Sequence, residues 1–123
     1  VDFVKVLQDG SLDYAQLTDL LSTETKTLVT LMQVNNETGV IQNVAQLAKC
    51  CRENGAALLL DAAQAVGKIP VNFQQLGATA LAFGAHKFHG PRGIGGLLLK
   101  RGVRLPPERW ARRRPLVRFR IQR

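Results

Sequence analysis

The sequence lacks any long apolar stretch. No segment approaches the roughly 20 consecutive apolar residues that a membrane-spanning helix needs, and the first ten residues, VDFVKVLQDG, lack the basic and then apolar layout of a secretory signal. We therefore expect a cytoplasmic protein. With 123 residues, 46% of them hydrophobic and 21% charged, the chain has the composition of one globular domain.

Cysteine is also scarce. The two cysteines, Cys50 and Cys51, are neighbours within a stretch with helical periodicity. Side chains of consecutive helical residues point in different directions, which disfavours a disulfide between them. We expect two reduced thiols with a packing role, as in a reducing compartment.

Acidic residues are nearly absent from the end of the chain. Residues 1–100 carry eight basic and eight acidic side chains, whereas residues 101–123 carry nine arginines and a single glutamate. Such a basic tail can contact anionic partners. It shows no zinc-ligand spacing and no glycine-aromatic RNA-binding pattern, so we expect neither a metal site nor specific nucleic-acid binding.

The pattern of apolar residues predicts alternating strands and helices. Apolar runs at 3–7, 27–34, 56–60, 79–83 and 97–99 are typical of strands. A helix after Asp13 and a second from Asn43 to Gly55 have N-capping residues and apolar positions on one face. Runs without polar alternation favour strands covered on both faces. The expected fold class is α/β, three-layered, with a mostly parallel sheet.

Several polar residues follow predicted strands directly. Asp61 comes after the apolar run ALLL, Gln64 lies three residues later, and Asn35 and Asn36 follow an earlier strand. The carboxyl ends of parallel strands meet at one edge of a sheet, where ligands bind. Asp61 could hold a cation such as a protonated pyridine nitrogen, and the small residues of AAQAVG suggest a close approach to the backbone there. The alternatives are helix capping for Asp61 and a turn for Asn35 and Asn36.

Lys87 lies just beyond another predicted strand, in the segment FGAHKFHGPRGIGG. A lysine at such a position can become the amine that forms a Schiff base, with His86 beside it as a phosphate contact or proton carrier. The alternatives are a solvated lysine and an ordinary loop histidine. The glycines after Lys87 precede a strand rather than a helix, which argues against a dinucleotide loop and favours a tight reversal.

The segments NNETG, DAAQAVGK and HKFHGP, taken in order and at these spacings, resemble the cysteine desulfurases, which are class V aminotransferase-fold enzymes. The resemblance covers about residues 1–104. It implies a partial large domain of fold type I that uses pyridoxal 5'-phosphate (PLP). It also implies that Lys87 binds the cofactor covalently and that His86 contacts its phosphate. Asp61 would pair with the pyridine nitrogen, and Asn36 and Gln64 would lie beside the ring hydroxyl.

The implied reaction converts L-cysteine to L-alanine and passes sulfur to an enzyme cysteine as a persulfide, for iron-sulfur cluster assembly or another sulfur-transfer pathway. Selenocysteine lyase or a related activity, and a non-catalytic α/β module with a basic anion-binding tail, remain alternatives. Sulfur-acceptor proteins and a homodimer of the full-length enzyme are implied as partners.

The sequence also departs from the family pattern. Gly84 stands three residues before the lysine, where the family has a phosphate-binding serine. The family's phosphate loop and persulfide cysteine are absent, so we expect a truncated enzyme that is inactive alone. Residues 105–123 form a divergent arginine-rich tail, for which a shifted reading frame is one hypothesis. We accordingly divide the chain into a partial PLP-binding domain at 1–104 and this tail.

Overall fold

The computed structural model describes residues 1–22, 26–104 and 119–121. Its centre is a five-stranded sheet in the order β1-β2-β3-β4-β5, formed by β1 (Leu28–Met32), β2 (Ala57–Asp61), β3 (Ala80–Gly84), β4 (Gly95–Leu99) and β5 (Phe119–Ile121). All neighbouring strands are parallel except β3 and β4. The α/β class and the mostly parallel sheet are therefore confirmed.

The helices follow the sequence pattern closely. Helix α1 (Tyr14–Leu21) begins after Asp13, whose side chain accepts from the Gln16 N–H, and α2 (Val44–Glu53) is capped in the same way by Asn43. Beyond α2, Gly55 takes a positive φ of 66°, a conformation that suits glycine. The short helices α3 (Phe73–Leu76) and η1 (Ala85–Phe88) complete the described elements.

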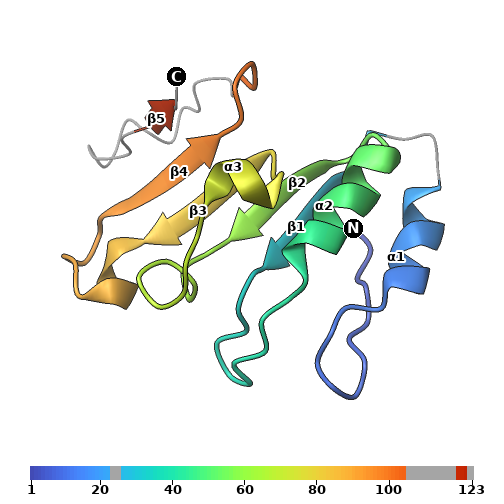
Figure 1. The fold of residues 1–123 in the computed structure, drawn as a ribbon, viewed down its shortest axis with the longest axis horizontal. Helices are drawn as coiled ribbons and strands as arrows, with labels where there is room; N and C mark the ends of the chain where they lie inside the picture. The colour runs from blue at the N-terminus through green and yellow to red at the C-terminus, as the bar shows by residue number, and fades with distance from the viewer. Residues whose placement is uncertain (23–25, 105–118, 122–123) are drawn as a thin grey trace.

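The hydrophobic core lies between the helices and one face of the sheet (Figure 1). It is centred on leucines that are less than 2% exposed: Leu47, Leu58, Leu60 and Leu81. Along β2 buried residues alternate with half-buried ones, so the opposite face is less covered. Of the three expected layers, the described residues form two.

One predicted strand is wrong. Residues 3–7 make only an isolated antiparallel bridge, between Val6 and Leu12, and Phe3 is 86% exposed. The segment instead folds back in a turn, in which the Leu7 N–H donates to the Ser11 carbonyl (2.8 Å). A β-branched, apolar run forms a strand only where a neighbouring strand can pair with it. Beyond its own turn, this segment bonds to α1, where the Lys5 N–H donates to Gln16 Oε1 (2.7 Å).

The predicted tail at 105–123 lies outside the described residues except for β5, which pairs with β4. The proposed boundary at residue 104 therefore stays a prediction. None of the helices in the described ranges has the length and apolar character needed to cross a bilayer.

Candidate cofactor site

The carboxyl ends of three strands meet at one edge of the sheet (Figure 1). In the strand register, Asp61 lies beside Met32 of β1 and beside Ala82 of β3. Just past these positions, the Gln33 N–H donates to the Asp61 carbonyl (2.9 Å). The segments that leave β1, β2 and β3, with Asn36, Gln64 and Lys87, therefore start from adjacent points.

Asp61 is exposed at the end of β2. Its Oδ1 accepts from the Ala63 N–H (2.9 Å), so the carboxylate caps the following turn, as the alternative reading expected. Its Oδ2 accepts no hydrogen bond from the described residues. One carboxylate oxygen thus has a local role, while the other is available to a ligand.

Gln64 lies in the turn that Asp61 caps. Its Oε1 accepts a short hydrogen bond from the Lys68 ammonium group. Because a lysine only donates, this contact fixes which end of the amide is oxygen and leaves the NH₂ group to donate elsewhere.

The two asparagines after β1 differ in their contacts. Asn35 Oδ1 accepts from the backbone N–H groups of Glu37 and Thr38, both at 2.9 Å, so Asn35 stabilises its own turn. The Asn36 side chain is exposed and makes no hydrogen bond to the described residues. Of the two, only Asn36 is available to a ligand.

His86 and Lys87 are exposed side chains on η1. Two backbone hydrogen bonds, each of 2.9 Å, hold the two ends of this helix in place. At its start the Ala85 N–H donates to the Ile94 carbonyl, and just past its end the Gly90 N–H donates to the Ala85 carbonyl. Between η1 and β4, Gly93 takes a φ of 79°, which confirms the tight reversal after Lys87.

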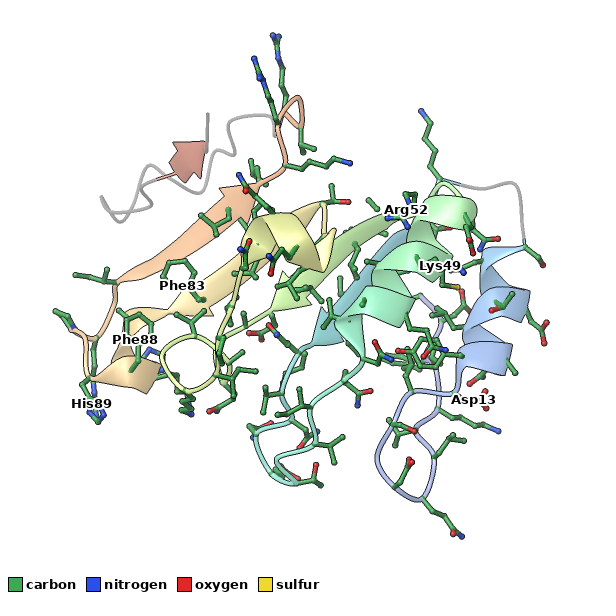
Figure 2. The ribbon with its side chains drawn as sticks, in the orientation of Figure 1. Asp13, Lys49, Arg52, Phe83, Phe88 and His89 are labelled. Atoms are coloured by element: carbon green, nitrogen blue, oxygen red, sulfur yellow. The ribbon has the colours of Figure 1, made fainter. Side chains whose placement is uncertain are left out.

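A contact between two loops links Gln64 to Lys87. Gly67 has a φ of 80°, and a Cβ atom at this position would lie 2.5 Å from the Phe88 Cβ. Only glycine allows this approach, so the turn that carries Gln64 lies directly against η1. The Phe88 ring in turn packs near that of Phe83, with centroids 6.2 Å apart (Figure 2). Sequence reasoning foresaw a close approach near Gly67 but missed Phe88 as the residue involved.

The His86 ring lies close against Gly84, so a side chain at position 84 would have to displace the imidazole slightly. A Cβ atom on Gly84 would lie 3.1 Å from Cε1 and 3.2 Å from Nδ1 of the imidazole. The His86 ring therefore lies beside the backbone where the family pattern has a serine.

Sequence reasoning missed Gln33 altogether. It is 4% exposed, and its Oε1 has no hydrogen-bond partner among the described residues. An unpaired buried amide oxygen is unfavourable. A polar residue at the end of an apolar strand was the available signal.

The fold is that of part of a PLP-dependent enzyme of fold type I, and the comparisons with known proteins agree. Residues 1–111 match the family model described as "Aminotransferase class-V". The chain belongs to this family, whose members depend on PLP.

Among its relatives, "Cysteine desulfurase IscS" of Buchnera aphidicola is 40% identical over 105 residues, which cover 85% of this chain and 26% of that protein. A solved "NIFS-LIKE PROTEIN" superposes with a TM-score of 0.80 at 34% identity and covers 87% of this chain and 30% of that one. A structure titled "SspA in complex with cysteine" has a TM-score of 0.73 at 27% identity, over 79% of this chain and 28% of that one. The chain thus spans about a quarter of the length of the curated relative.

Proposed function

We propose that this chain is the cofactor-anchoring part of a PLP-dependent cysteine desulfurase. The relatives with this name support the substrate class, and one structural neighbour is described as a complex with cysteine. The observation that carries the proposal is the contact of Gly67 with Phe88, because it brings the turn of Asp61 and Gln64 against the helix of Lys87.

The side chains at this edge fit PLP chemically. Asp61, with one unpaired carboxylate oxygen, would bind the protonated pyridine nitrogen. The Gln64 NH₂ group, oriented by Lys68, and the Asn36 amide would donate to the ring hydroxyl. His86 would contact the phosphate, and Lys87 would bind the aldehyde carbon. When bound, PLP supplies an electron sink for the substrate's α-carbon.

The residues of the chain then have distinct roles. Asp61 keeps the proton on the ring nitrogen through a charge-assisted hydrogen bond. Gln64 and Asn36 orient the ring through neutral donors. Lys87 Nζ, on a helix fixed at both ends, is the base that can move a proton at the substrate's α-carbon.

Sulfur transfer needs a thiol that these residues do not supply. In the overall reaction the C–S bond of L-cysteine breaks, the sulfur joins an acceptor thiol as a persulfide, and L-alanine leaves. Burial raises the pKa of the Cys51 thiol to about 11, and a thiol that stays protonated is a poor nucleophile. Cys50 Sγ lies 3.7 Å from the Thr18 hydroxyl on the helical side of the sheet. The proposal therefore includes an acceptor thiol other than these two cysteines.

The proposal further includes a cytoplasmic location, sulfur-acceptor proteins as partners and a homodimer of the full-length enzyme.

Absorbance spectroscopy of the purified chain with PLP tests the cofactor site. We expect a visible band of lysine-bound cofactor that is lost in Lys87→Ala and kept in Lys49→Ala, a control on the surface of α2. Because we expect this chain to be inactive alone, release of alanine from L-cysteine by the full-length enzyme tests the reaction. A dithiol is added as acceptor, and L-selenocysteine serves as a parallel substrate. A band of equal strength in Lys87→Ala would refute the assigned site.

A further inference from the structure

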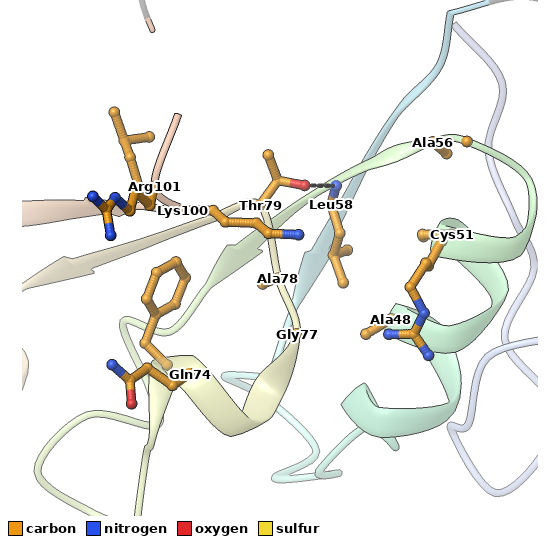
Figure 3. Close-up of a pocket in the computed structure, with 14 residues that line it drawn as sticks. Ala48, Cys51, Ala56, Leu58, Gln74, Gly77, Ala78, Thr79, Lys100 and Arg101 are labelled. Atoms are coloured by element: carbon orange, nitrogen blue, oxygen red, sulfur yellow. Dashed lines mark hydrogen bonds between the residues drawn. The ribbon is translucent and has the colours of Figure 1, made fainter. Parts of the chain in front are cut away.

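A cavity lies at the opposite, amino edge of the parallel strands. It has a volume of about 560 Å³ and lies where β2 and β3 begin and β4 ends, beneath the last turn of α2 (Figure 3). No residue of the candidate cofactor site lines it. Any ligand of this cavity would therefore bind independently of the proposed function.

The floor of the cavity is apolar. Cys51, Leu58 and Leu99 line it and are all buried. The one hydroxyl here, that of Thr79, accepts from the Leu58 N–H (3.0 Å), which satisfies that backbone group within the wall. An apolar surface of this size can accept the body of a small organic molecule.

The rim of the cavity is cationic. Arg52, Lys100 and Arg101 line it, and no acidic residue does. Arg52 Nη1 would lie 3.9 Å from a Cβ atom placed on Gly77, across the cavity from the end of β4. Figure 3 shows the Lys100 amine reaching over Thr79, whereas Arg101 points further out. Two cations thus approach the opening from different elements.

These cations have no acidic partner within the described ranges, where the only ion pair joins Lys49 and Glu53 (3.8 Å). The last carbonyl groups of α2 would repel an anion, but they are already engaged. The Cys50, Cys51 and Arg52 carbonyls accept from the N–H groups of Asn54, Ala56 and Gly55 at 2.8–3.3 Å. The negative end of the helix dipole is equivalent to about half a charge, so the three full positive charges of Arg52, Lys100 and Arg101 outweigh it at the opening.

We propose that this cavity binds a small organic dianion, with its apolar body on the leucine floor and its phosphate group between Arg52 and Lys100. A dianion suits two cations that approach from different sides, because it can bond to both. The apolar floor distinguishes such a ligand from inorganic phosphate.

Titration of the whole ¹⁵N-labelled chain with phenyl phosphate, followed by amide chemical shifts, tests the proposal. We expect shifts at Gly77, Thr79 and Lys100 that saturate with one Kd. Arg52→Gln and Lys100→Gln should each raise that Kd about tenfold, the effect of losing one charge-assisted hydrogen bond. Lys49→Gln removes a charge from the same helix outside the cavity and should leave the Kd unchanged.

Two further probes separate the contributions of the floor and the rim. Inorganic phosphate and benzyl alcohol should each bind more weakly than phenyl phosphate. Equal binding of inorganic phosphate would overturn the role of the floor, and equal binding of benzyl alcohol would overturn that of the cations. Shifts confined to the edge of Lys87, or no shifts at all, would overturn the site itself, and the amide spectrum shows whether each variant is folded.

Discussion

The helical face of the sheet and its carboxyl edge differ in how far the chain shields them from solvent. We call them the closed side and the open side. On the helical face of the sheet, Leu47, Leu58 and Leu60 are almost without solvent contact. At the carboxyl edge, Asn36, Asp61 and Lys87 are all exposed. The chain thus buries the helical face of the sheet and leaves the carboxyl edge exposed. We expect stability to depend on the first region and cofactor binding to depend on the second.

The sharpest contrast between the two sides is expected in stability. Leu60→Ala should lower the free energy of unfolding by about 2–5 kcal/mol, because it leaves a cavity under α2. Leu28→Ala, at a position that is 60% exposed, should change it by less than about 1 kcal/mol. Urea denaturation followed by circular dichroism measures both. Similar losses of unfolding free energy in Leu60→Ala and Leu28→Ala would mean that the hydrophobic core does not lie on the helical face of the sheet.

The pH dependence of stability tests the closed side. Burial raises the pKa of Cys51 to about 11, so folding keeps its proton on while the unfolded thiol ionises near pH 8.5. The stabilisation is complete below the unfolded pKa and is lost as the pH rises toward 11. The midpoint temperature of unfolding should therefore fall over this range, and less steeply in Cys51→Ala.

Cys50 provides the matched control, because its side chain is only half-buried. In the native protein at pH 8, iodoacetamide should modify Cys50 much faster than Cys51, because burial keeps the reagent from Cys51 and raises the pKa of its thiol. In denaturant the two rates should converge. Equal native rates would show that Cys51 is not buried.

Position 84 tests the open side. If a hydroxyl group there would bind the cofactor phosphate, Gly84→Ser should lower the Kd for PLP several-fold, the effect of one added hydrogen bond. Gly84→Ala is the control, because its Cβ meets the His86 ring at the same 3.1 Å without a hydroxyl. Fluorescence titration with PLP measures both. If Gly84→Ser and Gly84→Ala had the same Kd for PLP, a hydroxyl group at position 84 would not contribute to cofactor binding.

The smallest effect is expected at Lys68. Lys68→Met removes the donor that orients the Gln64 amide and should weaken PLP binding two- to fivefold, since about half of one hydrogen bond's effect is at stake. The visible spectrum of bound cofactor should shift as well, which loss of packing alone would not cause. Lys68→Arg should restore both. An unchanged spectrum of the bound cofactor in Lys68→Met would show that Lys68 does not orient Gln64 toward the cofactor.

The helical side was largely predictable, because its signals are local. Asn43 and Gly55 mark the ends of α2 in the sequence itself, and the apolar positions between them define its buried face. The strand predicted at residues 3–7 is not formed, because a strand also needs a neighbouring strand to pair with, and the local sequence does not reveal one.

The open side was predictable only in part. The carboxyl-edge rule predicted that Asp61 and Lys87 follow strands at this edge, which the structure shows. The roles that the family resemblance implies for them stay predictions. The contact between Gly67 and Phe88 joins segments 21 residues apart, and the buried, unpaired oxygen of Gln33 depends on three-dimensional packing. The local sequence signals only a close approach near Gly67 and a polar residue at the end of a strand, and it reveals neither Phe88 as the contact nor the missing partner of Gln33.

The central claim is that the open edge is a PLP site built around Lys87. The most direct measurement is to incubate the chain with PLP, reduce it with borohydride and map the labelled lysine by peptide mass spectrometry. The account predicts label at Lys87 well above the other five lysines, and a marked loss of that label in Asp61→Ala. Label spread evenly over Lys5, Lys49, Lys100 and Lys87 would contradict it.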